Sequence, residues 1–325
     1  MGKIDTVTKD YMKKNSVFAD AFNYFIYGGK QVIKPENLQE LDTTEIAFPF
    51  GNGDEVAVQK FRDLLKAAIL MMDGNAAYLI LGVENESEVK YAEPVKTGLY
   101  DFLQYSKQVQ QTAGRHREAK DRRGHNDGEF LTGFYREDKL TPVITLVILF
   151  GSKRWDGPRT LQEMMSTQNP DILKCVADYK INLIEPAAMG ADDLEKFHSS
   201  LRAVLGFIKY SNDGDELDAF LSNERELESL DVEAARVIKA CTNTDIEIDE
   251  KAEVINVCKA VREMNEKAAE KAAEKAAEKA AEKARLDTLL KDIKNATEAF
   301  HVSIEDAMKA LKVGKENQAI LMKMI

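Results

Sequence analysis

Three acidic residues form a local pattern that could hold a divalent cation. Glu84 and Glu86 directly follow the apolar run at residues 78–83, and Asp63 lies on the preceding element. The run has the length and composition of a buried strand. Side chains alternate between the two faces of a strand, so we expect Glu84 and Glu86 to project the same way.

Carboxylates grouped in this way are ligands for a hard cation such as Mg²⁺ or Mn²⁺. Such an ion can activate a water molecule and offset the charge of a phosphate. The pattern therefore favours a metal-dependent nuclease. The alternative is that these acids only mark the place where a buried strand returns to water, since short motifs often match by chance.

The elements that would position these acids alternate between helices and strands. Gly28-Gly29 ends an apolar helical pattern, and seven of the eight residues at 143–150 are apolar, as in a strand covered on both faces. This order predicts an α/β core. The expected elements are a helix to residue 27, loops with short extended pieces over 30–60, a turn at 51–54, a strand or helix over 60–72, a hairpin turn at 73–75, a strand at 77–83, a helix at 94–109 and a strand at 143–150.

The C-terminal half has a helical and acidic pattern over residues 191–260. Residues 266–283 then repeat Glu-Lys-Ala-Ala. Four residues turn a helix by about 400°, so each apolar stripe drifts by about 40° per repeat and forms no coiled-coil seam. We expect an exposed, semi-rigid helical spacer, followed by a small helical tail in which Ser303 caps a helix.

The distribution of charge matters more than the net charge of -11. Residues 1–160 contain 22 Lys and Arg against 23 Asp and Glu, a balance of -1, so the remaining residues carry -10. A basic segment at 115–125, expected to be a loop, could contact phosphates without reading base sequence. It could equally be an exposed, mobile charged loop. Its cationic residues are Arg115, Arg117, Lys120, Arg122 and Arg123.

Several other classes of protein are not supported. The sequence contains no GxxxxGK[ST] loop, no GxGxxG after a strand and no Gly-x-Ser-x-Gly elbow. Cys175, Cys241 and Cys258 form no CxxC pair, so we expect them to be small buried residues. No signal peptide or membrane-spanning run is evident, which predicts a cytoplasmic protein that does not contact a membrane.

The residues from Asp63 to Glu86 resemble the Rpn family of recombination-promoting nucleases, also described as YhgA-like putative transposases, in the PD-(D/E)XK superfamily. The resemblance covers roughly residues 10–170. It is carried further by the opening helix at 17–23, the helix at 94–101, residues 128–131, the strand at 142–147, Phe150-Gly151 and residues 155–158.

The resemblance implies a restriction-endonuclease-like core, which is a mixed sheet flanked by helices, with an α-helical C-terminal region. It also implies a Mg²⁺-dependent (or Mn²⁺-dependent) DNA endonuclease in which Asp63 and Glu84 are metal ligands and Glu86 assists. Glu86 departs from the family pattern, because the superfamily has Lys at this position and this family usually has Gln. Glu86 then either joins the metal shell or weakens catalysis, and Lys66 or Lys90 could supply a replacement cation.

The expected organisation is a nuclease-like domain (1–190), a helical region (191–262), the spacer (263–285) and a helical tail (286–325). DNA is the expected partner, and the C-terminal half could mediate homo-oligomerisation or bind a helical partner. Two other functions stay open: a degenerate nuclease core that only binds DNA or a partner, and a regulator of the antitoxin or immunity type that acts through its C-terminal helices.

Overall fold

The protein divides into two compact units, Met1–Ala260 and Val261–Ile325. The structure is a computed structural model and describes residues 3–47, 58–61, 63–72, 75–120, 126–249 and 251–322. The boundary between the units falls inside helix α10 (Val257–Phe300).

The first unit is built on a five-stranded sheet with the order β1-β4-β5-β6-β7. The first three strands of this order are antiparallel, and the last three are parallel. The mixed α/β fold class predicted from the sequence is therefore confirmed. The strands are β1 (Leu38–Glu40), β4 (Leu64–Met72), β5 (Asn75–Glu86), β6 (Val143–Leu149) and β7 (Asn182–Ile184). A separate pair joins β2 (Thr44–Ala47) to β3 (Val58–Phe61).

A long hairpin, β4–β5, carries the acidic residues. Its register runs from Met72 opposite Asn75 to Leu64 opposite Val83, so residues 64–72 of the ambiguous segment at 60–72 form a strand. The predicted strand at 77–83 extends through Glu86. Residues 73 and 74 of the predicted hairpin turn, and the predicted turn at 51–54, lie outside the described residues.

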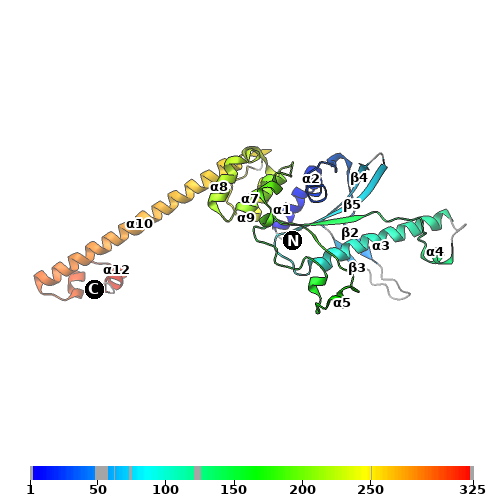
Figure 1. Cartoon of the computed structure of the whole chain (residues 1–325). Helices are drawn as coiled ribbons and strands as arrows, with labels where there is room; N and C mark the ends of the chain where they lie inside the picture. Colours follow the sequence, from blue (N-terminus) through cyan, green and yellow to red (C-terminus); the bar gives the residue numbers. More distant parts are fainter. Residues whose placement is uncertain are drawn as a thin grey trace. The chain divides into compact units, whose positions relative to one another are not determined.

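The N-terminal helices cover one face of the sheet (Figure 1). The sequence predicted one helix before Gly28, whereas the structure has α1 (Lys3–Met12) and α2 (Asn15–Tyr27), with Gly28 in the left-handed conformation at the end of α2. Lys66 of β4 is fully buried under this layer. Its ammonium donates to the Lys13 carbonyl and to Asn15 Oδ1, both at 2.6 Å.

Helix α3 (Glu93–Ala119) covers the opposite face (Figure 1). Lys66 pairs with Leu81, whereas Thr145 of β6 pairs with Gly82, the next residue along β5. Thr145 therefore points to the other face, where its hydroxyl donates to the carboxylate of Asp101 in α3 at 2.6 Å. The chain crosses from β5 through α3 to the parallel strand β6, as a parallel connection requires. The prediction for β6 is confirmed, since almost all of its residues are buried.

Residues 191–260 of the first unit are mostly helical, as predicted. The buried faces of α7 and α9 meet around residues such as Val204, Phe207 and Ile238. The helices are α4 (Asp127–Thr132), α5 (Pro170–Leu173), α6 (Ala191–Leu194), α7 (Leu201–Tyr210), α8 (Gly214–Asn223) and α9 (Val232–Thr242), with a short ladder between β8 (Leu230–Asp231) and β9 (Val254–Ile255).

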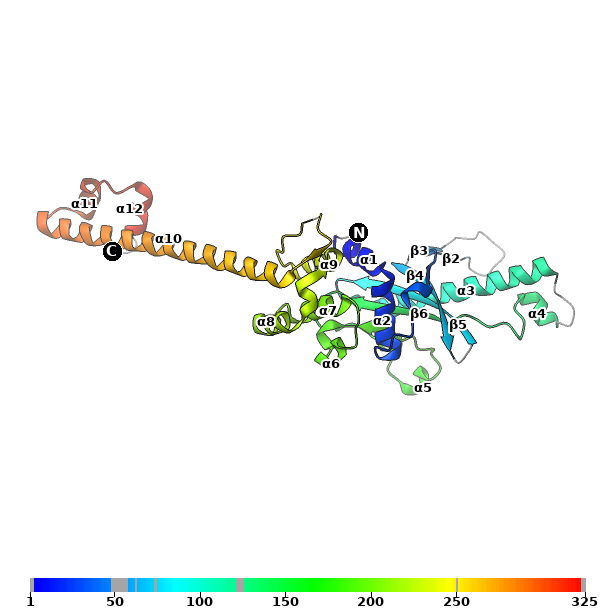
Figure 2. The same ribbon diagram turned by 90° about the horizontal axis from the view of Figure 1, so that it is seen from above.

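The second unit has its own small core. Helices α11 (Ile304–Ala310) and α12 (Lys315–Leu321) pack against the end of α10 around Ile293, Met308 and Leu321 (Figure 2). Ser303 caps α11 by accepting from the Asp306 amide, as predicted. The Glu-Lys-Ala-Ala run lies within α10 with every residue exposed, which confirms a solvated helix.

Two further predictions can be compared with the fold. The expectation that all three cysteines are buried is wrong, because Cys175 is exposed and the other two are half-buried. Cys175 follows the short helix α5 on the surface, where no core is available to enclose it. No helix in the described part of the chain is both long enough and apolar enough to cross a membrane.

Candidate functional site

Glu84 and Glu86 lie at the end of β5 and face α3. Glu84 pairs with Val147 of β6. It therefore lies on the same face of the sheet as Thr145, which is two residues before Val147 in β6. Only 2% of Glu84 and 4% of Glu86 is exposed, although both are acidic. The structure therefore places the two carboxylates side by side, as the alternation of the strand predicted, but inside the protein and beneath a helix.

The ammonium of Lys96 bridges the two glutamates. Its Nζ lies 2.9 Å from Glu84 Oε2 and 2.6 Å from Glu86 Oε1. Pro94 occupies the first turn of α3, where its fixed φ suits a helix start. Lys96 belongs to the same turn, so the helix begins directly over the end of β5. Its Nζ also lies 3.5 Å from Glu93 Oε1, and these charges together keep the pKa of Lys96 raised despite its burial.

Asp63 joins the same group from the residue before β4. Its Oδ2 accepts a hydrogen bond from the backbone amide of Asn85 at 3.0 Å. Burial raises the pKa of Asp63, while that hydrogen bond and the charges of Lys9 and Lys96 act in the opposite direction. The three acids predicted from the sequence are therefore brought together.

Burial also raises the pKa of Glu84 to about 7. The positive charge of Lys96 acts to lower this pKa, and the negative charge of Asp63 acts to raise it. Burial likewise raises the pKa of Glu93. Glu84 Oε1 and Glu93 Oε2 are buried and accept no hydrogen bond. Within the described part of the chain, the cluster sets four carboxylates against the ammonium groups of Lys96 and of Lys90, whose Nζ is 3.1 Å from Glu86 Oε2, and the charge of Lys9 also acts on Asp63. These described cations compensate its negative charge only in part.

This donor set fits a hard divalent cation in one respect. Glu84 Oε1 is an unpartnered carboxylate oxygen beside Asp63, and Mg²⁺ commonly uses one or two carboxylates and completes its shell with water and phosphate. Among the described residues, however, no three or more His, Cys, Asp or Glu side chains form a complete metal-binding group. Any such ion would therefore depend on water or substrate for its other ligands.

The two lysines suggested as replacement cations behave differently. Lys90 reaches Glu86, whereas Lys66 points to the opposite face of the sheet and contacts the turn between α1 and α2. The suggestion of Lys66 is thus wrong, because strand alternation separates it from the acids. The principal cation, Lys96, and the buried acid Glu93 were not predicted from the sequence. Their i,i+3 spacing in the first turn of a helix after the strand was the available signal.

The basic residues lie at the other end of α3. Arg115 and Arg117 are helical and Lys120 is the C-cap with φ 52°, so the predicted loop is incorrect up to Lys120. The predicted helix 94–109 ends ten residues too early. At 1.5 Å per residue, Arg115 is about 28 Å from Lys96 along the helix axis. These side chains and the acid cluster are therefore not brought together. Arg122, Arg123 and His125 lie outside the described residues.

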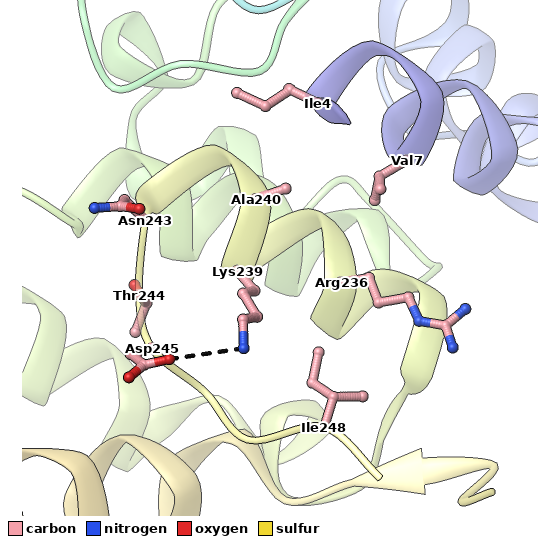
Figure 3. Close-up of a pocket in the computed structure, with 9 residues that line it drawn as sticks. All are labelled: Ile4, Val7, Arg236, Lys239, Ala240, Asn243, Thr244, Asp245 and Ile248. Atoms are coloured by element: carbon pink, nitrogen blue, oxygen red, sulfur yellow. Dashed lines mark ion pairs between the residues drawn. The ribbon is translucent and has the colours of Figure 1, made fainter. Parts of the chain in front are cut away.

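A cavity of about 640 Å³ lies elsewhere in the first unit, between α1 and α9 (Figure 3). The ammonium of Lys239 donates to the Ile246 carbonyl at 2.6 Å and lies 3.8 Å from Asp245, so its charge is paired with a carboxylate of the protein. None of the site residues predicted from the sequence lines this cavity.

Comparisons with known proteins add no assignment: no family model, no curated protein and no solved structure matches this chain.

Proposed function

We propose that this protein is a Mg²⁺-dependent (or Mn²⁺-dependent) DNA endonuclease of the recombination-promoting type, with a PD-(D/E)XK core, acting in the cytoplasm. The observation that carries the proposal is the convergence of Asp63, Glu84 and Glu86 under the first turn of α3. Buried carboxylates with uncompensated charge are costly for stability and are typical of functional sites. The sequence resemblance supplies the specific activity.

Each residue of the cluster has a distinct role in this proposal. Asp63 and the unpartnered Oε1 of Glu84 would hold the cation. A bound Mg²⁺ lowers the pKa of a coordinated water and offsets the phosphate charge. Lys96 fixes the orientation of both glutamates and supplies the positive charge that the superfamily pattern, with Lys, would place at position 86. Lys96 and Lys90 together offset the charge of Glu86. Glu86 therefore need not repel an approaching phosphate.

Cleavage of supercoiled plasmid tests the proposal. With Mg²⁺ or Mn²⁺ the wild type should nick or linearise the plasmid, Asp63→Ala should abolish this, and Glu88→Gln, an exposed glutamate just after β5, should cleave like the wild type. If Glu86 hinders catalysis, Glu86→Gln should cut faster. Wild-type protein that binds plasmid but never cuts it with either metal would refute the proposal.

The second candidate is a nuclease-fold protein that binds DNA or a partner without cutting. The observation that favours it is the Lys96 ammonium, which already contacts both glutamates where a metal ion would be needed. Thermal unfolding separates the two functions. A ligand that binds only the folded state at 100 times its Kd stabilises by about 2.7 kcal/mol. A nuclease should show a Mg²⁺-dependent rise in Tm that is absent in Asp63→Ala, whereas the binding protein should show none.

A further inference from the structure

A cavity of about 310 Å³ gives access to Asp63 from the side of α1. It is lined by Lys9 and Lys13 at the end of that helix, by residues 40–43, and by Asp63 with the first residues of β4. Neither Glu84 nor Glu86 lines it. Its volume is at the low end of the range of about 300–1,000 Å³ for ligand sites, so it suits a small group such as one phosphate with its sugar.

The three lysines that line this cavity differ in what they already contact. Lys66 is fully buried and donates to the Lys13 carbonyl at 2.6 Å. The ammonium of Lys13 pairs with Asp10 at 2.8 Å. Lys9 is half-buried, and its ammonium forms no hydrogen bond or ion pair within 4.0 Å with any described residue. Its charge nevertheless lowers the pKa of Asp63, so the two groups are close enough to act on one ligand.

The α3 side of the acid cluster offers no comparable approach. Only 2% of Glu84 and 4% of Glu86 is exposed beneath this helix. Lys96 and Lys90 are already paired with these glutamates. The basic C-terminal end of α3 lies about 28 Å from the first turn of the helix, too far to hold a phosphate at the cluster. The cation that can meet a phosphate beside Asp63 is therefore Lys9.

We infer that a backbone phosphate of DNA binds in this cavity, where Lys9 contacts it and Asp63 lies beside it. Because it names substrate contacts of the proposed nuclease, the inference rests on that function. A lysine ammonium is a compact charge that can neutralise one phosphate without reading base sequence. The cleaved strand then approaches the acids from the α1 side of the cluster. Without a metal ion, the carboxylate of Asp63 repels the same phosphate, which gives the test a second arm.

Binding of the full-length protein to a short labelled DNA duplex tests the inference in EDTA, where no divalent metal is present and no metal-dependent cleavage occurs. Lys9→Gln should weaken binding and reduce the slope of log K against log salt by about 0.9, the value for one phosphate contact. Over about a fourfold rise in salt, wild-type affinity should then fall about 3.5 times more than that of the variant. Asp63→Asn should instead strengthen binding, because it removes the charge that repels the phosphate.

Matched variants control for folding and for diffuse charge. Lys9→Arg keeps the cation and should retain the wild-type slope. Lys13→Gln removes a charge that is already paired in the same cavity, and should reduce the slope less than Lys9→Gln does. Lys30→Gln removes an exposed cation shortly after α2, outside the cavity, and should leave the slope unchanged. Glu88→Gln removes an exposed carboxylate outside the cavity and should strengthen binding less than Asp63→Asn.

The outcomes separate this inference from the proposed function. Binding that Lys9→Gln weakens and Asp63→Asn strengthens, in a protein that never cuts plasmid, would support the inference and refute the nuclease. Plasmid cleavage that requires Asp63, with the wild-type salt slope in Lys9→Gln, would do the reverse. Equal losses of slope in Lys9→Gln and Lys30→Gln would also overturn the inference, since they would indicate diffuse attraction to the surface. So would failure of both the wild type and Asp63→Asn to bind the duplex.

Discussion

Replacing Glu84 with Gln should stabilise the protein at neutral pH and above, although it removes a partner of Lys96. The pKa of Glu84 rises from 4.5 in the unfolded chain to about 7 in the folded protein, chiefly because the carboxyl is buried. One pKa unit corresponds to about 1.36 kcal/mol, so the shift amounts to about 3 kcal/mol. Glu84 is only 3% exposed in its side chain, so solvent screening does not reduce this figure substantially.

The sign follows from proton binding. Below pH 4.5 both states carry the proton and Glu84 costs nothing. Between pH 4.5 and about 7 the unfolded chain has lost the proton while the folded protein keeps it, so stability falls as pH rises. Above pH 7 the full cost of about 3 kcal/mol is present. Gln imitates the protonated carboxyl at every pH, and Lys96 keeps Glu86 and Glu93 as partners in the variant.

Urea unfolding followed by the fluorescence of Trp155 is a suitable assay. This is the only tryptophan, and it is buried against Val147, Leu149 and Ile181 in the first unit, so it reports on the sheet that carries the site. The stability of Glu84→Gln minus that of the wild type should rise by about 3 kcal/mol between pH 4 and pH 8. Asp63 and Glu93, whose pKa values are also raised, are present in both proteins, so the cost of their own burial cancels in the difference and only their coupling to Glu84 remains.

The control is Glu88→Gln, which removes an exposed carboxyl just beyond the same strand. Its difference from the wild type should stay within about 0.5 kcal/mol across the same range, as is usual for surface substitutions. A flat curve for Glu84→Gln, or a variant less stable than the wild type at pH 8, would refute the reasoning. It would mean that the pair with Lys96 outweighs the cost of burying the carboxylate.

Two further outcomes are expected. Asp20 accepts from the His198 and Ser199 amides and from the Ser199 hydroxyl, so Asp20→Ala should lower the free energy of unfolding by about 2–4 kcal/mol in the same assay; a loss below about 1 kcal/mol would contradict this. Cys175 should react with a thiol reagent at pH 8 before Cys241, whose pKa burial raises to about 12, and equal rates would be contrary to the structure.

Local sequence patterns were sufficient for much of the first unit. The apolar run before Glu84, the buried strand at 143–150 and the stop at Gly28 each rest on periodicity or backbone conformation, which act over a few residues. The alternation of a strand even predicted that Glu84 and Glu86 share a face. The prediction for α3 failed at its C-terminal end, where charged residues gave no apolar stripe although the helix continues to Ala119.

The sequence by itself therefore determined which acids lie together at the end of β5 and that the surrounding core is α/β. Only the tertiary structure decided their charge environment. Lys96 and Lys66 have the same side chain, and both lie close to Glu84 in the sequence. Strand register nevertheless turns Lys66 to the α2 face, whereas helix α3 places Lys96 between the glutamates. The raised pKa of Glu84 has the same origin, because burial under α3 is a property of packing between segments and not of any local run of residues.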